Sequence, residues 1–194
     1  MMTFQLFLLI CSFSTALLQS DSEDEILSHL KQTESRTEDT GSLSDPQQRL
    51  TSFLTEKRVA FSASLMASGS SGYIGPFNTQ RTLVFRNVVA NIGNAYNPNT
   101  GFFIAPVRGA YHFEFYLHGH GHWLYYTAAV LVKNGTPLFS AWEHQNFNSV
   151  NPSNGVTLLL EIGDVVLLRL FQNSAVFDNQ NRHTTFSGHL LFPM

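Results

Sequence analysis

Short runs of alternating apolar and polar residues fill the chain from Val59 onward, and they constrain its fold more than any other feature. Two clear examples are Val59–Leu65 (VAFSASL) and Gly109–His120 (GAYHFEFYLHGH). Successive side chains on a strand point to opposite faces of a sheet, so this alternation predicts half-buried strands and not helices. Turn signals recur about every 8–12 residues. We therefore predict an all-β sandwich or jelly roll of about ten strands.

Turn residues mark two hairpins and a closing strand within this pattern. Asn134-Gly135 stands between two apolar runs in Ala128–Phe139, which is a strong hairpin signal. The segment Gly155–Phe171 (GVTLLLEIGDVVLLRLF) is predicted to form two strands that turn at Gly163-Asp164. The last strand is expected over Thr184–Phe192.

Residues 1–20 have the features of a secretory signal peptide. Their apolar run is too short to span a bilayer comfortably, and small residues offer cleavage between positions 16 and 20. The only cysteine, Cys11, lies inside this segment. The mature chain is therefore expected to be extracellular and without disulfides.

Residues 21–56 differ sharply in composition from the rest of the chain. They carry nine acids and three bases, whereas residues 57–194 carry five acids and eight bases. We interpret the first segment as an acidic linker or a short coiled coil, and the linker is favoured because no heptad pattern is sustained. The excess of three positive charges on the second segment is too small to indicate nucleic-acid binding.

The spacing of aromatic residues and glycines over residues 57–194 is specific. Tyr111, Phe113 and Phe115 occupy every second position after Gly109. Further blocks are VAFSA, NIGNAY, TGFFIAPVRGAYHFEF, KNG, LEIGDVVLL and TFSGHLLFP. In this order and spacing they resemble the globular heads of complement C1q, the C1q/TNF-like jelly rolls. Residues 57–194 are thus identified as a C1q-like globular domain.

The resemblance assigns a structural role to its signature residues. Aromatic members are expected in the core, and Gly93, Gly101 and Gly109 are expected at turns or close backbone approaches. The full set is Phe61, Phe85, Asn91, Gly93, Tyr96, Gly101, Phe103, Gly109, Tyr111, Phe113, Phe115, Gly163, Asp164, Phe186 and Gly188. These residues indicate a fold and do not mark a binding site.

The resemblance also implies a homotrimer, or a heterotrimer with related chains, that binds extracellular ligands through loops. The strands of Gly155–Phe171 are apolar on both faces, more than one sandwich core needs, which favours association. The ligand would be recognised by the variable loops, for which no sequence rule names a partner. These loops are Ser68–Gln80, His118–Trp123, Trp142–Asn154 and Phe177–His183.

The run His118, His120 and His122 is a candidate metal site. On a strand the three imidazoles would share one face and could bind zinc. No acid or cysteine accompanies them, and the intervening glycines favour an exposed loop between strands. A surface that responds to mildly acidic pH is a further alternative.

Calcium is the one cofactor that the resemblance implies. Some members of the family bind it near the apex, and the corresponding positions here are Glu143, His144 and Asn151. Only the first and last offer the hard oxygen ligands that calcium prefers.

Asn134-Gly135-Thr136 forms an N-glycosylation sequon, and an exposed hairpin tip can serve both as a turn and as an acceptor.

No catalytic constellation stands out. The sequence has no G-x-S-x-G or H-E-x-x-H motif, and the acids after position 57 are scattered. We therefore expect a binding protein and not an enzyme. The leading hypothesis is a secreted trimeric pattern-recognition or innate-immune binding protein. The alternatives are a cerebellin-like or adipokine-like signalling ligand for a cell-surface receptor, and a metal-storage protein that uses the histidine run.

Overall fold

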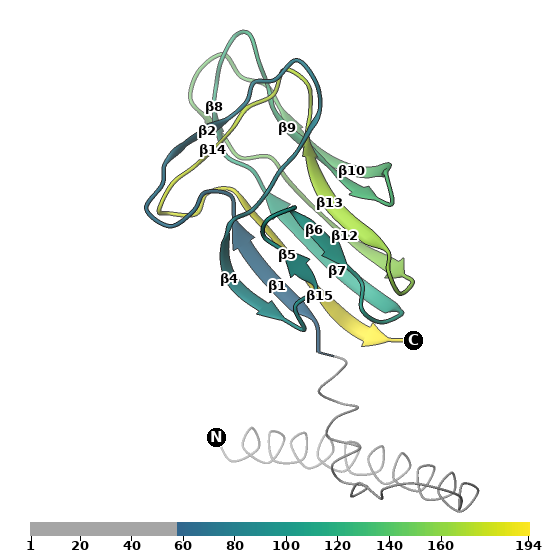
Figure 1. Ribbon diagram of the computed structural model, residues 1–194. Coiled ribbons are helices and arrows are strands. Elements are labelled where there is room, and N and C mark those ends of the chain that lie inside the picture. Colours follow the sequence, from purple (N-terminus) through teal and green to yellow (C-terminus); the bar gives the residue numbers. More distant parts are fainter. Residues whose placement is uncertain (1–57) are drawn as a thin grey trace, which may run out of the picture. The chain divides into compact units, whose positions relative to one another are not determined.

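The computed structural model describes residues 58–194, which form two packed antiparallel sheets (Figure 1). This described part contains strands and no helix. Residues 1–20 and 21–56, for which we predict a leader and an acidic linker, lie outside it. Within residues 58–194 there is accordingly no helix that could cross a membrane.

The first sheet has five strands in the order β12-β7-β15-β1-β4. Strands β12 and β4 form its two edges. In its interior β1 pairs with β15, which places the first and last strands side by side. The bounds are β1 Ala60–Ser64, β4 Asn87–Ile92, β7 Gly109–Tyr116, β12 Ser153–Leu160 and β15 Thr185–Pro193.

The second sheet has the order β10-β9-β13-β6-β5, with β3 paired to β13. Each of these two orders contains five strands, which makes ten in the sandwich apart from β3. The predicted all-β jelly roll of about ten strands is therefore confirmed. The bounds are β3 Arg81–Thr82, β5 Tyr96–Asn97, β6 Phe102–Ile104, β9 Thr127–Lys133, β10 Thr136–Glu143 and β13 Val165–Leu170.

An aromatic core lies between the sheets because the alternating strands each turn one face inward. Along β7 the odd-numbered residues Tyr111, Phe113 and Phe115 are fully buried, and the residues between them are not. Phe61 stacks on Tyr96 at 4.6 Å between ring centroids and meets Phe186 edge-on at 4.9 Å. Such ring pairs add to the stabilisation from burial alone.

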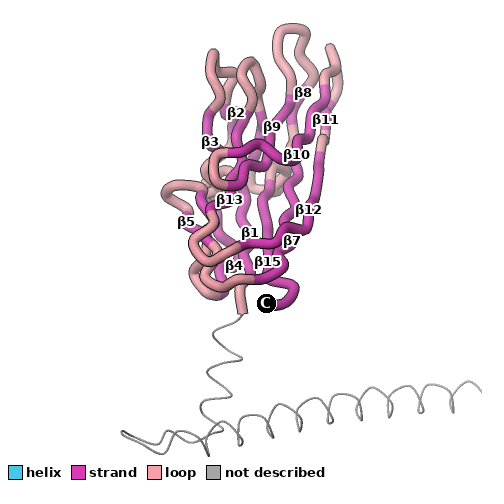
Figure 2. Tube along the Cα trace, turned by 90° about the vertical axis from the view of Figure 1, so that its right-hand side faces the viewer, coloured by secondary structure: helices cyan, strands magenta, loops and turns pink. Residues whose placement is uncertain are grey.

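Two small sheets lie beyond one end of the sandwich. They pair β11 (Ser149–Val150) with β8 (Gly119–His120), and β14 (Val176–Asp178) with β2 (Gly72–Ile74). Strand β7 begins opposite Pro193 and ends opposite Thr185, so the segment after Tyr116 leaves at the end away from the C-terminus. We call this the distal end; Figure 2 shows β2, β8 and β11 there, with loops beyond them.

Candidate functional site

The distal end is built from four segments that are far apart in the sequence. They contain β2, β8, β11 and β14 with their adjoining loops, and they correspond to the four variable loops predicted to carry recognition. β8 pairs with β11, and Phe177 N–H donates to His118 O at 2.7 Å, which joins the β14 segment to the β8 segment. The four loops therefore form one continuous surface.

Asp178 and Thr184 hold this surface to the sandwich. The buried Asp178 carboxylate accepts hydrogen bonds from Met66 N–H at 3.0 Å and from Thr184 N–H at 3.2 Å. The Thr184 hydroxyl accepts from His118 N–H at 3.0 Å and donates to Phe177 O at 2.7 Å. Buried polar groups that are fully paired in this way rigidify the backbone around them.

The three histidines of the predicted metal run have different surroundings. His118 is buried and bonds Asn151 through Nδ1 at 2.7 Å, whereas His120 bonds the Tyr73 hydroxyl. His122 stacks on Tyr125 with ring centroids 4.1 Å apart. Only Gly119 and His120 are in strand conformation, so the period that would align the three rings is not sustained. Among residues 58–194 no group of three His, Cys, Asp or Glu side chains is arranged to hold a metal.

A cluster of imidazole and aromatic rings lies at the distal end around His118, which is buried, whereas Tyr73 and His183 are exposed. His183 lies against His118 with ring centroids 4.6 Å apart, and Phe177 contacts His118 and His120 at 5.8 and 5.1 Å. Tyr73 meets Phe177 at 5.0 Å. These rings come from β2, β8 and β14 and the loop before β15, so sequence spacing alone could not have grouped them.

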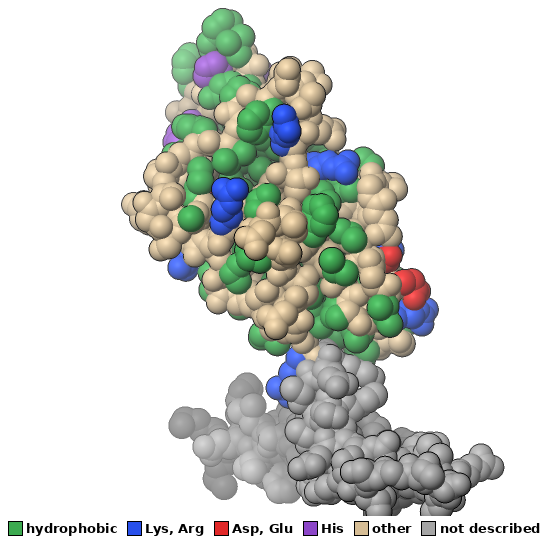
Figure 3. Space-filling model, in the orientation of Figure 1, with side chains coloured by type: hydrophobic (Ala, Val, Ile, Leu, Met, Phe, Trp, Pro, Cys, Tyr) green, Lys and Arg blue, Asp and Glu red, His purple; other side chains and the backbone are tan. Residues whose placement is uncertain are grey.

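Exposed aromatic residues lie on the outside of the same loops. Trp142 and His144 both contact Tyr126, with ring centroids 5.3 and 4.9 Å apart. Trp123 and Phe147 are among the most exposed hydrophobic side chains of the described residues. Figure 3 shows hydrophobic and histidine side chains together at the upper end of the molecule. The apolar run WLYY at 123–126, which begins at the last residue of the predicted loop His118–Trp123, is a sequence signal for Trp123 and Tyr126.

The residues predicted for calcium are only partly brought together. One oxygen of Glu143 accepts from Asn151 N–H at 3.2 Å, and the other accepts from the Gln145 amide at 2.8 Å. His144 instead lies 3.2 Å from His122 O through its Nε2 atom. Calcium takes about six to eight oxygen ligands, and these residues of one chain do not supply them.

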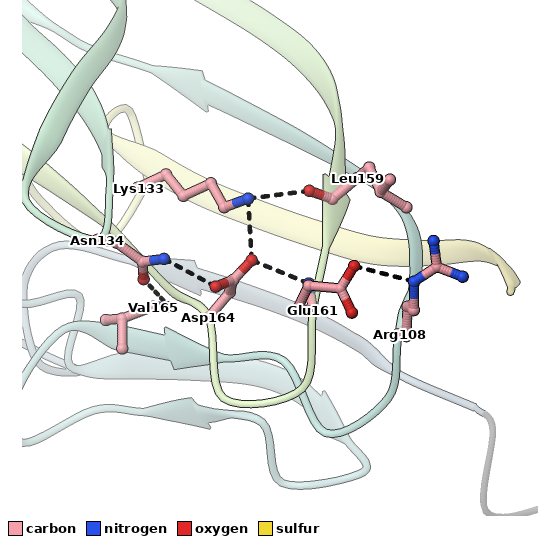
Figure 4. Close-up of polar contacts among 7 residues, drawn as sticks. All are labelled: Arg108, Lys133, Asn134, Leu159, Glu161, Asp164 and Val165. Carbon is pink, nitrogen blue, oxygen red and sulfur yellow. Dashed lines mark hydrogen bonds and ion pairs between the residues drawn. The ribbon is translucent and has the colours of Figure 1, made fainter.

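The sequon residue Asn134 belongs to a polar network at the β9–β10 hairpin (Figure 4). Its amide donates to Asp164 Oδ1 at 2.7 Å, and its Oδ1 accepts from Val165 N–H at 2.8 Å. The Lys133 ammonium lies 2.9 Å from Asp164 Oδ2. Hydrogen bonds from Lys133 and then Asn134 lower the pKa of Asp164 from 3.8 to about 2.

A shallow depression of about 200 Å³ lies on the outward face of the five-stranded sheet. Within it the His112 Nε2 atom is 3.1 Å from Glu114 Oε1, and the Tyr116 hydroxyl donates to Glu114 Oε2 at 3.3 Å. The lining residues are His112, Glu114, Tyr116, Ser153, Asn154 and Gly155.

Comparison with known proteins identifies this sandwich. The family model of the C1q domain matches residues 60–191, which include the main strands of both sheets except the last two residues of β15. The chain belongs to the C1q domain family.

Relatives of this C1q domain include "Complement C1q tumor necrosis factor-related protein 3" of Homo sapiens and of Mus musculus. Each is 36% identical to the chain over 138 residues, which is 71% of this chain and 52% of the relative. The chain thus spans about half the length of these curated relatives.

Solved structures show the same fold at low sequence identity. The globular domain of zebrafish complement 1qA is 20% identical, with a TM-score of 0.51 over 71% of this chain and 99% of that one. Eiger TNF from S. frugiperda is 10% identical, with a TM-score of 0.56 over 71% and 95%. A C1q/TNF jelly roll is therefore the fold of the described residues.

The signature residues of this C1q domain lie in its core and its turns. The Asn91 side-chain amide donates to Tyr96 O at 2.8 Å, and its Oδ1 accepts from Tyr96 N–H at 3.2 Å. These two bonds hold the turn before β5. Burial raises the pKa of Tyr96 to about 12, and its neutral hydroxyl donates to Phe85 O at 3.0 Å. Gly101 has φ +78°, and an added Cβ would lie 2.4 Å from Leu83 O. The other seven signature aromatics are also buried: Phe61, Phe85, Phe103, Tyr111, Phe113, Phe115 and Phe186.

Proposed function

We propose that the protein is a secreted trimeric binding protein that recognises extracellular ligands through its distal end, in the manner of an innate-immune recognition module. The main support for this proposal is that four loops of a C1q domain present exposed aromatic, imidazole and amide side chains at the distal end. No enzymatic role is proposed. The predicted leader at residues 1–20 supports secretion.

The outward face of the five-stranded sheet supports the trimer. Leu159 on β12 is 47% exposed there, and its β7 partner in the ladder is Ala110. An apolar side chain beside a small residue on a broad sheet face is suited to burial against another copy. Three copies would present three distal ends together, and simultaneous binding raises the overall affinity without any new contact.

The test is binding of the purified secreted protein to bacterial, yeast and glycan-coated surfaces in physiological calcium. Saturable binding that weakens when the chain is made monomeric would support multivalent recognition. Absence of binding to every surface would contradict the recognition role.

A second candidate is a signalling ligand for a cell-surface receptor. It is supported by the likeness to a protein named for both C1q and tumor necrosis factor, and by the TNF-like fold. Pull-down from intact cells, followed by identification of one saturable receptor, would favour this role over surface recognition.

Calcium binding by Glu143, His144 and Asn151 stays a prediction from the resemblance. A trimer would supply three copies of Glu143 and Asn151, so any site would have to be shared between chains. Calorimetric titration of the assembled protein, with Glu143→Gln as the comparison, tests it directly.

A further inference from the structure

Three large apolar side chains project from two loops of the distal end. Trp123, Leu124 and Phe147 are 71%, 62% and 79% exposed. The two loops are in direct contact, because Gly121 N–H donates to Asn148 O and an added Cβ on Gly121 would lie 2.6 Å from Phe147 O. The three side chains therefore belong to one surface, which we call the apolar tip.

The backbone beneath the apolar tip is held in place. The His122 ring stacks on Tyr125, and its Nδ1 accepts from Leu124 N–H at 3.1 Å. The His144 ring reaches across from the second loop to His122 O. These contacts hold the backbone of residues 122–124, from which the exposed Trp123 and Leu124 side chains project.

The two loops that carry the apolar tip contain no cation, and their one carboxylate, Glu143, is hydrogen-bonded to Asn151 N–H and to the Gln145 amide. Residues 117–126 and 144–152 contain no Lys, Arg, Asp or Glu, and their polar side chains are mainly imidazoles and amides. A surface that lacks cations does not select anionic lipids or nucleic acids. Leu124 has neither a hydrogen-bonding side-chain group nor an aromatic face on which a sugar ring could stack.

We propose that the apolar tip inserts into the head-group boundary of a lipid bilayer, with Trp123, Leu124 and Phe147 as the inserting residues. Tryptophan favours this boundary because its ring is apolar and its N–H can bond polar groups. The amides and imidazoles around the tip match the uncharged polar part of a zwitterionic surface. The inference rests on the proposed function, since it names the partner of the same distal end.

The tryptophan content of the chain makes insertion directly measurable. The whole sequence contains two tryptophans, Trp123 and Trp142. In a Trp142→Phe variant, emission reports on Trp123 alone. We expect phosphatidylcholine vesicles to shift this emission to the blue, and spin-labelled acyl chains to quench it. Unchanged emission at saturating vesicle concentration would overturn the proposal.

Substitution at the tip tests the named residues. Leu124→Ser and Phe147→Ser are each expected to lower vesicle partitioning about tenfold, because each removes an apolar side chain that insertion would bury in the bilayer. Ile162→Ser is the matched control, since Ile162 is 72% exposed at the turn between β12 and β13, near the opposite end of the sandwich. A comparable loss in the control would overturn the assignment to the tip.

Lipid composition and other ligands distinguish the remaining outcomes. Partitioning that needs phosphatidylserine and vanishes in high salt would overturn insertion, because it would indicate charge-driven binding. Binding to glycans or to a receptor without binding to vesicles would overturn this inference and leave the proposed function standing. Vesicle binding without any surface or receptor ligand would contradict the recognition role and support insertion. Light scattering checks that all variants share one oligomeric state.

Discussion

At the scale of single residues, Asp164 shows how one side chain fixes several strand ends. It contacts Lys133 and Asn134 beside the β9–β10 hairpin, and it accepts from Glu161 N–H at 2.9 Å in the turn before β13 (Figure 4). Its side chain is 14% exposed, so these bonds are partly shielded from water. The residue thus links two turns that are about 30 positions apart.

We predict that Asp164→Asn destabilises the domain by about 1–2 kcal/mol at neutral pH, because a folded pKa of about 2 lies below the ordinary 3.8. The contribution is complete above about pH 4 and is lost as the pH falls toward 2. Denaturant unfolding of both proteins between pH 2 and 6 measures it. A stability difference that stays constant over this range would contradict the assignment.

Gly188 permits the closest packing between β15 and the core aromatics. An added Cβ would lie 2.5 Å from Phe113 Cδ1 and 2.8 Å from Phe61 Cε1. We expect Gly188→Ala to cost about 1–3 kcal/mol of unfolding free energy, since these rings cannot move without disturbing the core. Gly155→Ala, whose nearest neighbour would be Phe113 O at 3.3 Å, should cost less in the same thermal unfolding experiment.

At the scale of elements, the β9–β10 hairpin combines a turn with a sequon. Asn134 has φ +50° and Gly135 has φ +85°, the left-handed conformations that a tight hairpin turn requires. The Asn134 side chain also bonds Asp164 and Val165 beside it. The same asparagine can therefore act both as glycan acceptor and as part of the fold.

Two substitutions separate these roles. Asn134→Ala and Thr136→Ala should both abolish any glycan, which mass spectrometry after glycosidase treatment detects. Only Asn134→Ala should lower the unfolding free energy, by about 1–2 kcal/mol, because it removes two hydrogen bonds and forces alanine into a left-handed conformation. Equal stability of the two unglycosylated variants would contradict the structural role.

At the scale of the whole molecule, two parts of the surface, the distal end and the outward face of the five-stranded sheet, are expected to contact different partners. The distal end carries recognition in our proposal, and the outward face of the five-stranded sheet carries assembly. The depression around His112, Glu114 and Tyr116 lies on that face and would be covered in a trimer.

We predict that Leu159→Glu converts a trimer to monomers, because it places a charge on the face proposed to be buried between copies. Light scattering at micromolar concentration measures the mass. Ile104→Glu, at a side chain 46% exposed on the other sheet, is the matched control and should leave the trimer intact. Monomeric wild-type protein at this concentration would contradict the trimer itself.

The fold could be predicted from the sequence because its signals are local. The alternation in Gly109–Tyr116 assigns each side chain of β7 to the core or to the outside, whatever the partner strand. Asn134-Gly135 likewise specifies its hairpin through the conformations that these two residues adopt most easily. The aromatic spacing then restricts the sandwich to one family.

The candidate site was decided by the tertiary structure. His118 and His183 are stacked although 65 positions separate them, and the loops of Trp123 and Phe147 meet through contacts that no sequence pattern marks, such as Gly121 N–H to Asn148 O. Loop side chains follow no period, so their neighbours depend on the lengths and pairing of the strands that carry them. The histidine run indicated a metal site because a regular strand would place all three imidazoles on one face. In the folded chain each of the three imidazoles has a different partner. The sequence by itself determined the sandwich and its core; only the folded sheets determined which loop residues share the distal end.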